Sequence, residues 1–400
     1  MNPLIKWPGG KSREIDKIKP LIPEHKRYVE PFFGGGALFF NLTPQNAAIN
    51  DISESLIQYY QLIKKQDKQL YDLLVCYNNS FDNLVRVCSN KDRDLMDLFL
   101  KFKNDVISAG ELHLLLKKFI FSLSDDINSG FSEKLLLDKN DFDEFLLKNT
   151  TDKFTRTVTN YNKKPFSEED LKENLITGFT SGYYMYFRKI FNDINLGRLK
   201  DQSAQYQAAN FYFIREYCYG SMFRYNAKGE FNIPYGGMSY NRKNMMSKID
   251  NMFNREIDTL FANTDIYCSD FEDFFDNIGL TKDDFIFLDP PYDTDFSDYE
   301  GKDFTKNDQE RLAYSLKKTL AKFILVIKNT DFISSLYDKD FNILSFDKQY
   351  TYNVRSRNNR DVEHLPCASL QRRSKFFPRH PCCIMCQSML CNFRFPYQHI

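Results

Sequence analysis

Two uninterrupted apolar runs, residues 284–288 and 323–327, constrain the fold of this chain more than any other feature of its sequence. Strands that helices cover on both faces of a parallel sheet have continuous apolar runs, whereas half-exposed strands alternate with polar residues. We therefore expect both runs to be central strands of an α/β domain. Asp289 directly follows the first run, in the position where open α/β sheets bind their ligands.

Residues 1–65 have the same α/β texture. The pattern predicts a strand, a glycine turn, a helix, a second strand and an amphipathic helix, at Tyr28–Glu30, Phe33–Gly36, Ala37–Asn41, Ala47–Asn50 and Ser53–Lys65. With an acidic residue, Asp51, after the second strand, this order is typical of a nucleotide-binding unit. We therefore expect an α/β, doubly wound, Rossmann-like sheet that is assembled from two separated chain segments.

The stretch between these segments has a different pattern of apolar residues. Leucine and phenylalanine recur at helical spacing over residues 70–215, which predicts a mostly helical insertion. Within it, the polar stretch Asn149–Lys164 reads as a flexible link. Residues 216–242 are rich in Tyr, Gly and Asn, and we expect a hairpin or a long ordered loop there.

Charge and hydropathy bound the class of protein. Lys+Arg and Asp+Glu both number 54, so any basic face for nucleic acid has to be local. The chain lacks an apolar run of about 18 residues, the length of a membrane helix, and its N-terminus lacks a signal-peptide core. We expect a cytoplasmic protein that has no membrane partner. The oligomeric state stays open, with a monomer as the expectation.

The tail, residues 366–400, departs from the rest in composition. It has five Arg/Lys, no acidic residue and five of the nine cysteines. The spacing His380-x-Cys382-Cys383-x-x-Cys386 offers a zinc site as one alternative, but structural zinc usually takes two well-separated ligand pairs. We favour a disordered or foreign extension, from a change of reading frame for example, and expect no metal site.

The sequence Asp289-Pro290-Pro291-Tyr292 suits the methylation of an exocyclic amine. The lone pair of such a nitrogen is delocalised into the ring, which makes the amine a poor nucleophile. Hydrogen bonds from its N–H groups to Asp289 and to the Pro290 carbonyl would orient the lone pair and stabilise the positive charge that develops on nitrogen. Tyr292 offers a face for base stacking. The alternative is a plain strand-ending turn.

Three further motifs have both a functional and a structural interpretation. The glycines of Glu30–Gly36 allow close approach of a ligand at a helix N-terminus, or form a simple turn. Asp51 can accept hydrogen bonds from both ribose hydroxyls of a nucleoside, or cap the next helix. Trp7, the single tryptophan, can pack on an adenine or anchor the N-terminus, and Lys11 can meet a carboxylate or a phosphate.

In this order the motifs resemble those of the Dam-type adenine-N6 DNA methyltransferases: K-W-x-G-G-K, E-P-F-x-G-x-G, N-D and D-P-P-Y. The resemblance extends to the string R-Y-N-x-x-G-x-F-N-x-P-x-G, which runs from Arg224 to Gly236. It implies transfer of methyl from S-adenosylmethionine to N6 of a flipped adenine in duplex DNA, without metal, and a role in restriction–modification. It also implies a catalytic domain over 1–68 and 250–365 and a target-recognition domain over 69–249.

The resemblance carries three sets of site residues to this chain. The catalytic set is Asp289, Pro290, Pro291 and Tyr292. The set that contacts S-adenosylmethionine is Trp7, Lys11, Phe32, Gly34, Gly36, Asp51 and Asp289. The DNA-binding set is Tyr219, Met222, Arg224, Asn226 and Pro234, with Tyr219 as the aromatic that wedges into the base stack.

The chain also departs from the family pattern. Its middle segment is long, Gly220 and Glu216 replace an amide and a basic residue of the enzymes that read GATC, and Pro366 interrupts the last expected strand. The recognition sequence is therefore open. The alternatives are methylation of cytosine N4 or of RNA, and a DNA-binding relic without catalysis. A dehydrogenase is disfavoured because the G-x-G-x-x-G fingerprint is absent.

Overall fold

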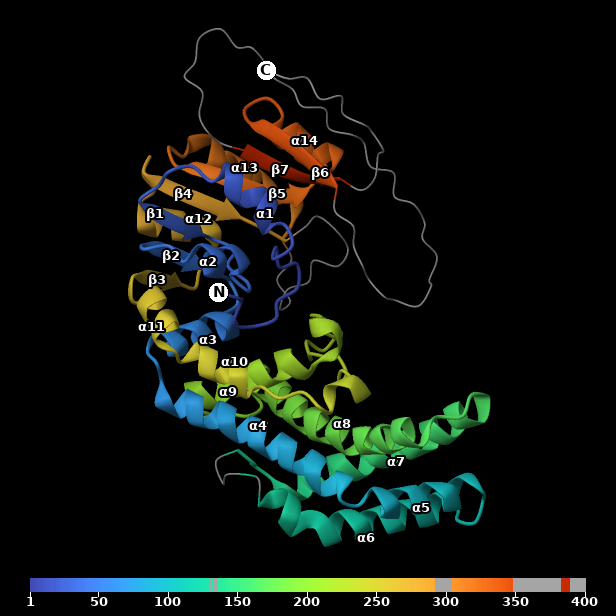
Figure 1. The fold of residues 1–400 in the computed structure, drawn as a ribbon. Coiled ribbons are helices and arrows are strands. Elements are labelled where there is room, and N and C mark those ends of the chain that lie inside the picture. Colours follow the sequence, from blue (N-terminus) through green and yellow to red (C-terminus); the bar gives the residue numbers. More distant parts are fainter. Residues whose placement is uncertain (130, 132–134, 292–303, 348–382, 389–400) are drawn as a thin grey trace, which may run out of the picture. The chain divides into compact units, whose positions relative to one another are not determined.

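A computed structural model describes residues 1–129, 131, 135–291, 304–347 and 383–388 (Figure 1). The chain divides into two compact units. The first consists of Met1–Asn2, Lys11–Ile57 and Asn263–Ile400, and the second of Pro3–Gly10 and Gln58–Ala262. The resemblance predicts boundaries at residues 68/69 and 249/250, whereas the two units divide at residues 57/58 and 262/263, and Pro3–Gly10 groups with the second unit.

The first unit contains a seven-stranded sheet in the order β3-β2-β1-β4-β5-β7-β6. Every pair of neighbouring strands is parallel. The doubly wound α/β architecture predicted from the sequence is confirmed. The strands are β1 (Arg27–Glu30), β2 (Ala47–Asn50), β3 (Thr264–Tyr267), β4 (Asp284–Leu288), β5 (Lys322–Lys328), β6 (Asn342–Asp347) and β7 (Cys383–Ser388).

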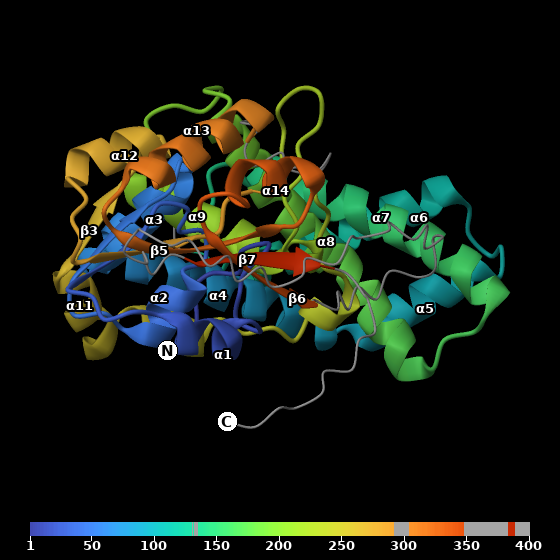
Figure 2. The ribbon, with the colours of Figure 1, turned by 90° about the horizontal axis from the view of Figure 1, so that it is seen from above.

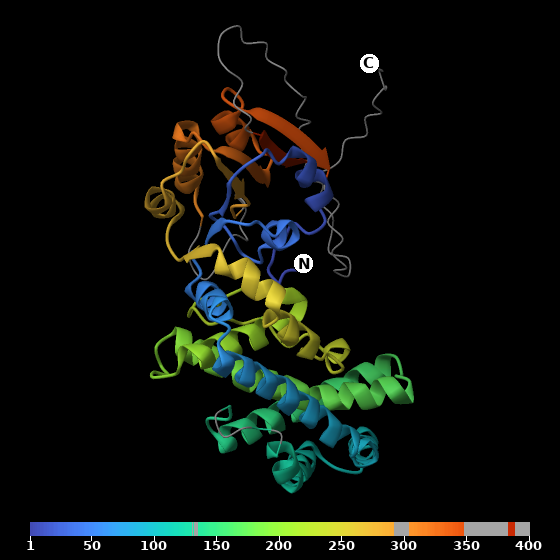
Figure 3. The same cartoon turned by 60° about the vertical axis from the view of Figure 1, so that its left-hand side comes forward.

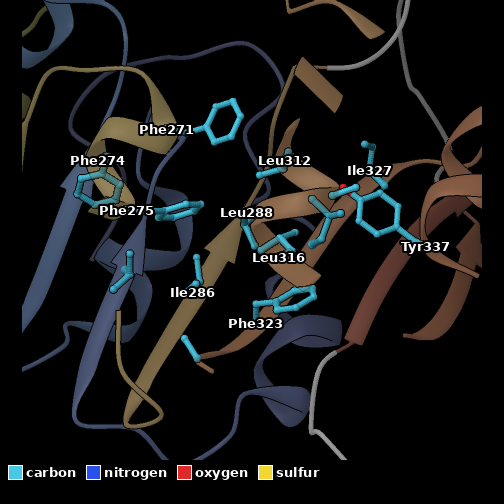
Figure 4. Packing of buried hydrophobic residues seen from close by; sticks show 14 of the residues in the cluster. Phe271, Phe274, Phe275, Ile286, Leu288, Leu312, Leu316, Phe323, Ile327 and Tyr337 are labelled. Atoms are coloured by element: carbon cyan, nitrogen blue, oxygen red, sulfur yellow. The ribbon is translucent and has the colours of Figure 1, made fainter. Parts of the chain in front are cut away.

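The two faces of the sheet are covered by different helices (Figure 2). On one face, α12 (Phe271–Ile278), α13 (Lys306–Lys318) and α14 (Asp331–Tyr337) pack on alternate residues of the central strands, such as Ile286 and Leu288 of β4. Figure 4 shows this apolar cluster, which joins Phe271 and Phe274 to Leu312, Phe323 and Tyr337. Because both faces are covered, all five residues of β4 are buried, as its unbroken apolar run predicts.

The opposite face is packed by aromatic rings. Tyr28 of β1 lies 6.2 Å from Phe39 and 6.0 Å from Phe285, measured between ring centroids. Phe39 belongs to α2 (Ala37–Leu42), which follows the glycine turn, and α1 (Ile15–Ile18) and η1 (Lys19–Leu21) come before β1. Successive side chains of a strand point to opposite faces. Tyr28 and Glu30 therefore share a face, and Val29 belongs to the other one.

The strand order reverses between β1 and β4, which pair in parallel with Val29 opposite Ile286. From β1 the sheet continues to β2 and β3 on one side, and from β4 to β5 on the other. At such a switch point the loops that leave the two strands diverge and open a crevice for ligands. The loop after Glu30 and the loop after Leu288 therefore begin side by side.

The tail contributes a strand. Cys383–Ser388 forms β7, which pairs with β5 and β6 through the backbone. The expectation of a disordered extension is therefore wrong for these six residues, whereas its foreign origin stays a prediction. The physical reason is tertiary, because β5 and β6 supply the backbone partners of this segment. Pro366 and the remaining members of the cysteine and histidine cluster lie outside the described residues.

The second unit is mostly helical, as predicted. Its helices are the last part of α3 (Glu54–Lys64), α4 (Lys68–Ser89), α5 (Asp92–Lys103), α6 (Ala109–Asn128), α7 (Lys139–Lys163), α8 (Glu168–Asn195), α9 (Ala204–Tyr217), η2 (Tyr219–Ser221), η3 (Met238–Tyr240), α10 (Met246–Met252) and α11 (Arg255–Ala262). Among the described residues, no helix is both long enough and apolar enough to cross a membrane.

The predicted flexible link at Asn149–Lys164 is wrong, because almost all of it lies within α7. Thr150, Phe154 and Thr157 recur at helical spacing and are buried. The hydroxyl of Thr157 donates to the carbonyl of Lys153 at 2.7 Å, so its polar group is satisfied within the helix. Tertiary packing therefore stabilises a helix from residues whose local preference favours it only weakly.

Two glycines let α7 and α8 approach closely along their lengths (Figure 3). A Cβ atom on Gly182 would lie 2.7 Å from Cα of Leu146 and 2.8 Å from the carbonyl oxygen of Phe145. A Cβ atom on Gly178 would lie 2.8 Å from Cα of Thr150. Both contacts are with the backbone of α7, which cannot move aside as a side chain can.

Gly182→Ala is therefore expected to lower the free energy of unfolding by about 1–3 kcal/mol, because overpacking outweighs the better helix propensity of alanine. The measurement is urea unfolding followed by circular dichroism. Gly110→Ala in α6 is the matched control, since nothing lies within 4 Å of a Cβ atom there. Equal stability of the two variants would contradict this account of the α7–α8 contact.

The hairpin (residues 218–242) follows α9, within the stretch 216–242 where the sequence predicts it. Antiparallel bridges join Cys218 to Tyr235 and Tyr225 to Phe231. The inner arm is anchored on α8, where the carboxamide of Asn192 bonds both the N–H and the carbonyl of Phe231. Phe231 is 1% exposed, whereas residues 226–229 at the tip are exposed. The expectation of a hairpin or an ordered loop is confirmed.

Candidate functional site

Asp289 leaves the carboxyl end of β4 and meets a lysine from the N-terminal segment of the same unit. Nζ of Lys11 donates to both carboxylate oxygens of Asp289, at 2.5 Å to Oδ2. The lysine side chain is 2% exposed and the aspartate side chain is 18% exposed. The pair thus joins two motifs that are 278 residues apart in the sequence. The aspartate keeps access to solvent, as a group that contacts a substrate needs.

Burial and one hydrogen bond fix the start of the loop after Asp289. Pro290 is buried, and the carbonyl of Pro291 accepts a hydrogen bond from Nε2 of Gln309 at 3.2 Å. Gln309 lies on α13 and is fully buried. The two prolines have no N–H to donate, so the local carbonyls are available as acceptors. Tyr292, the fourth residue predicted for this loop, lies outside the described residues.

The glycine turn after β1 is tied to the loop after β2. Oδ2 of Asp51 accepts from the N–H of Gly34 at 2.8 Å, and Oδ1 accepts from the N–H of Ser53 at 3.0 Å. Gly36 has a φ of 63°, and a Cβ atom there would lie 2.4 Å from the ring of Phe33. Only glycine fits this turn without strain. Burial raises the pKa of Asp51, against the opposing effect of the backbone hydrogen bonds.

Neighbouring side chains complete this part of the first unit. Asn50 donates to the carbonyls of Pro31 and Ser269, at 3.0 Å each, and so braces the turn from the next strand. Phe32 packs at the edge of the apolar cluster, 5.6 Å from Phe271 between ring centroids. Ser53 accepts from the N–H of Leu56 at 3.3 Å and therefore occupies the capping position of α3 that the structural interpretation assigned to Asp51.

Glu30 is a buried carboxyl group beside these residues, and it was not predicted as a site residue from the sequence. It ends β1, is 2% exposed, and accepts a hydrogen bond from the hydroxyl of Tyr28 at 2.7 Å. Burial raises the pKa of Glu30 well above its ordinary value; the Tyr28 hydrogen bond opposes this shift, and the charges of Asp289 and Asp51 add to it. The available signal was a carboxylate at the carboxyl end of a strand, directly before the glycine turn.

This pKa shift predicts a dependence of stability on pH. A carboxyl group with a raised pKa in the folded chain contributes stability at low pH that is lost as the pH rises toward its folded pKa. Glutamine at Glu30 cannot titrate. The free energy of unfolding of Glu30→Gln should therefore rise relative to the original chain as the pH increases above the ordinary pKa of a glutamate. Urea unfolding at a series of pH values measures this difference, and a constant difference would count against a protonated Glu30.

Trp7 belongs to the second unit, where it packs beside the hairpin. Its ring lies 4.7 Å from Phe223 and 6.4 Å from Phe211 between centroids. The guanidinium carbon of Arg215, on α9, lies 3.7 Å from the centroid of Phe223 and 5.5 Å from that of Trp7. Arg215 is 1% exposed and donates to the carbonyls of Ser221 at 2.7 Å and of Lys6 at 3.3 Å. The N-terminal segment and the start of the hairpin are thereby joined.

All five residues of the predicted DNA-binding set lie on the hairpin and are exposed. Tyr219 is 53% exposed and Met222 is 41% exposed, so both side chains are accessible at the surface. Between them, Gly220 has a φ of 62°, in the left-handed region that favours glycine. This conformation accounts for glycine where an amide was expected. The other three members of the exposed set are Arg224, Asn226 and Pro234.

Glu216, at the end of α9, is fully buried below the hairpin. Its Oε2 forms ion pairs at 2.8 Å with Nζ of Lys243 and with Nζ of Lys248. Burial alone would raise the pKa of Glu216, but the charges of the two lysines outweigh it and hold that pKa below its ordinary value. A basic residue expected at this position is thus replaced by the acidic centre of an internal ion-pair network.

The predicted site residues therefore fall into two groups. The first unit brings together Lys11 with Asp289 and Gly34 with Asp51, and it also contains Phe32, Gly36, Pro290 and Pro291. The second unit contains Trp7 and the exposed residues of the hairpin. Within the part of the chain that the structure describes, no cluster of three or more His, Cys, Asp or Glu could hold a metal ion. Chemically, the first group offers carboxylate and carbonyl acceptors, and the second offers aromatic and cationic side chains.

Comparison with known proteins identifies a family. A family model described as D12 class N6 adenine-specific DNA methyltransferase matches residues 7–177 and 147–352. The Type II methyltransferase M.CviBI of Paramecium bursaria Chlorella virus NC1A is 24% identical over 361 residues, which are 89% of this chain and 94% of the relative.

Two further relatives span most of their own length. The Type II methyltransferase M.MjaIII of Methanocaldococcus jannaschii is 26% identical, over 86% of this chain and 90% of the relative. A protein named DNA adenine methylase from Vibrio cholerae is 21% identical, over 79% of this chain and 76% of the relative.

Proposed function

This chain belongs to the D12 class of N6 adenine-specific DNA methyltransferases, and on that premise we propose that it methylates a flipped adenine in duplex DNA with S-adenosylmethionine as the methyl donor. The observation that carries the proposal is the position of Asp289. This carboxylate stands at the carboxyl end of β4, beside β1, where the strand order reverses. A base that is rotated out of the stack can reach a group in such a crevice, whereas a stacked base cannot.

The residues of the first unit suit S-adenosylmethionine. In the proposal the Asp51 carboxylate, which has about four acceptor sites, accepts from the ribose hydroxyls in addition to the backbone N–H groups that already bond it. The glycine turn, with Gly34 and Gly36 at positive φ, lets a ligand approach the backbone closely. In the proposal Lys11, Phe32 and Asp289 line the same site. Trp7 stays in the proposed set through the resemblance of its motif.

Asp289 and the Pro290 carbonyl act on the adenine amino group. Each accepts one of its N–H hydrogen bonds, which turns the nitrogen lone pair toward the methyl group. S-adenosylmethionine supplies a methyl group activated by its positive sulfur. As the new N–C bond forms and the S–C bond breaks, positive charge develops on nitrogen, and the negative charge of Asp289 stabilises it. The nitrogen then releases one proton to solvent.

The hairpin serves as the DNA-contacting surface. Tyr219 is an exposed aromatic side chain that can enter a base step as an adenine leaves it. Arg224 offers paired donors that suit guanine in the major groove. Met222, Asn226 and Pro234 belong to the same surface. The relatives named Type II methyltransferases support a role in host marking within a restriction–modification system.

The test is the transfer of labelled methyl from S-adenosylmethionine to unmethylated duplex DNA, followed by digestion to nucleosides. Label in N6-methyladenine supports the proposal. Label in N4-methylcytosine, or transfer to RNA only, would replace the proposed substrate. If the chain binds both DNA and S-adenosylmethionine without transfer, it is a DNA-binding relic, and the proposal is overturned.

A further inference from the structure

The hairpin has two faces that differ in role. Residues 224, 225 and 226 stand opposite residues 232, 231 and 230, as the Tyr225–Phe231 bridge and two backbone hydrogen bonds show. Tyr225 and Phe231 share one face, and Phe231 packs against Phe191 and Phe223 in the core of the second unit. Because alternate side chains of a strand point to opposite sides, the side chains of residues 224, 226, 230 and 232 share the outer face.

One contact on the outer face holds a side chain that can read DNA. Nε of Arg224 donates to Oδ1 of Asn232 at 2.7 Å. This is the one hydrogen bond that the structure gives to the Arg224 side chain among the described residues. The bond fixes the plane of the guanidinium group and leaves its two terminal nitrogens as donors. Two parallel donors in a fixed plane match the O6 and N7 acceptors of guanine.

The remaining polar side chains of the outer face form hydrogen bonds that stabilise the tip of the hairpin. Oδ1 of Asn226 accepts from the N–H groups of Lys228 at 2.9 Å and of Glu230 at 3.0 Å. Nδ2 of Asn226 donates to Oε2 of Glu230 at 3.1 Å. Oε1 of Glu230 in turn accepts from both terminal nitrogens of Arg198 at 2.9 Å. The acidic group is thus neutralised, and the carboxamide of Asn226 is used within the turn.

We propose that Asn232 is a positioning residue that orients Arg224 for a guanine, and that Asn226 shapes the hairpin tip instead of reading a base. The inference rests on the proposed function, since it assigns specificity to the hairpin of that enzyme. Its physical basis is preorganisation. An arginine side chain loses several rotatable bonds of freedom when it binds a base, and a side chain that is already held loses less.

The experiment is a selection of duplex DNA from a randomised library by the full chain, read by sequencing the bound fraction. The original chain should enrich guanine at one position or more. Arg224→Ala should reduce the enrichment at one such position by about tenfold or more, the size of a lost bidentate contact. Asn232→Ala should reduce the guanine enrichment at the same position by about threefold to tenfold. In the Arg224→Ala background, adding Asn232→Ala should cause no further reduction.

Two asparagine variants are the controls. Asn232→Asp keeps an acceptor for Nε of Arg224, so the guanine preference should remain even if the added charge weakens binding overall. Asn226→Ala should weaken binding to all sequences alike, because it alters the tip and not a base contact. A duplex with 7-deazaguanine at the enriched position removes one of the two acceptors. The original chain should lose more affinity on it than Asn232→Ala does.

The outcomes separate this inference from the proposed reaction. Base preference without methyl transfer overturns the reaction and leaves the role of Asn232 in place. The positioning role alone is overturned if Asn232→Ala lowers the base enrichment equally at all positions of the site. It is also overturned if Asn232→Ala lowers the guanine enrichment as much in the Arg224→Ala background as in the original chain. If the original chain enriches no sequence, both the inference and the DNA-reading part of the proposed function fail.

Discussion

Asp289→Ala is expected to lower the turnover of methyl transfer by about 10³-fold or more. The variant removes the acceptor that orients the amine and the charge that stabilises the developing cation, and nothing else described at the end of β4 replaces either. The buried Lys11 also loses its ion pair with this carboxylate. Turnover is measured as labelled methyl transferred per enzyme at saturating DNA and S-adenosylmethionine.

Two variants make this result interpretable. Asp283→Ala changes an exposed aspartate at the other end of β4, where it pairs with Lys26, and should leave turnover unchanged. Asp289→Asn keeps one side-chain acceptor without the charge and should fall between the original chain and alanine. A folded Asp289→Ala variant that keeps activity within about tenfold of the original chain would refute the role assigned to this carboxylate.

Glu216→Ala is expected to lower the free energy of unfolding of the second unit by about 3 kcal/mol. Glu216 is fully buried, and its removal leaves Lys243, which is 17% exposed, without its buried counter-charge. The measurement belongs at pH 7, because burial lowers the pKa of Lys243 to about 8 and the lysine is charged below that pH. Urea unfolding followed by circular dichroism gives the free energy.

The expected order of related variants tests the ion-pair network further. Lys248→Ala should cost less than Glu216→Ala, because Lys248 is 40% exposed and Glu216 keeps Lys243 as a partner. Since the network lies below the hairpin, Glu216→Ala should also weaken DNA binding. If Glu216→Ala is as stable as the original chain, the ion-pair network contributes no stability.

Much of the fold followed from the pattern of apolar residues. The runs at 284–288 and 323–327 predicted β4 and β5, and the opening segment predicted β1, the glycine turn, α2, β2 and α3. Each of these elements satisfies a local rule of period or turn chemistry. Two predictions were wrong where local rules are weak. Asn149–Lys163 is helical because α8 buries one face of this segment. Cys383–Ser388 enters the sheet because β5 and β6 pair with it.

The candidate site was predicted less completely than the fold. The motifs around Lys11, Asp51 and Asp289 could be named from the sequence, but the Lys11–Asp289 pair joins chain segments far apart, so no local rule gives it. The pKa of Glu30 depends on burial and on neighbouring charges, which the sequence does not show. The sequence assigned no role to Asn232, which is part of the motif from Arg224 to Gly236. Its contact with Arg224 could not be predicted without the register of the hairpin.

The sequence by itself determined the α/β class, because the period of apolar residues is a local property of the chain. It also determined the family and hence the reaction, because the motifs and their order can be identified without the structure. Tertiary structure decided which groups meet: Lys11 with Asp289 at the switch point, Gly34 with Asp51, and Glu216 with its two lysines. The physical reason is that burial and electrostatic pairing depend on distances in space, and parallel strand order sets those distances between residues that are remote in sequence.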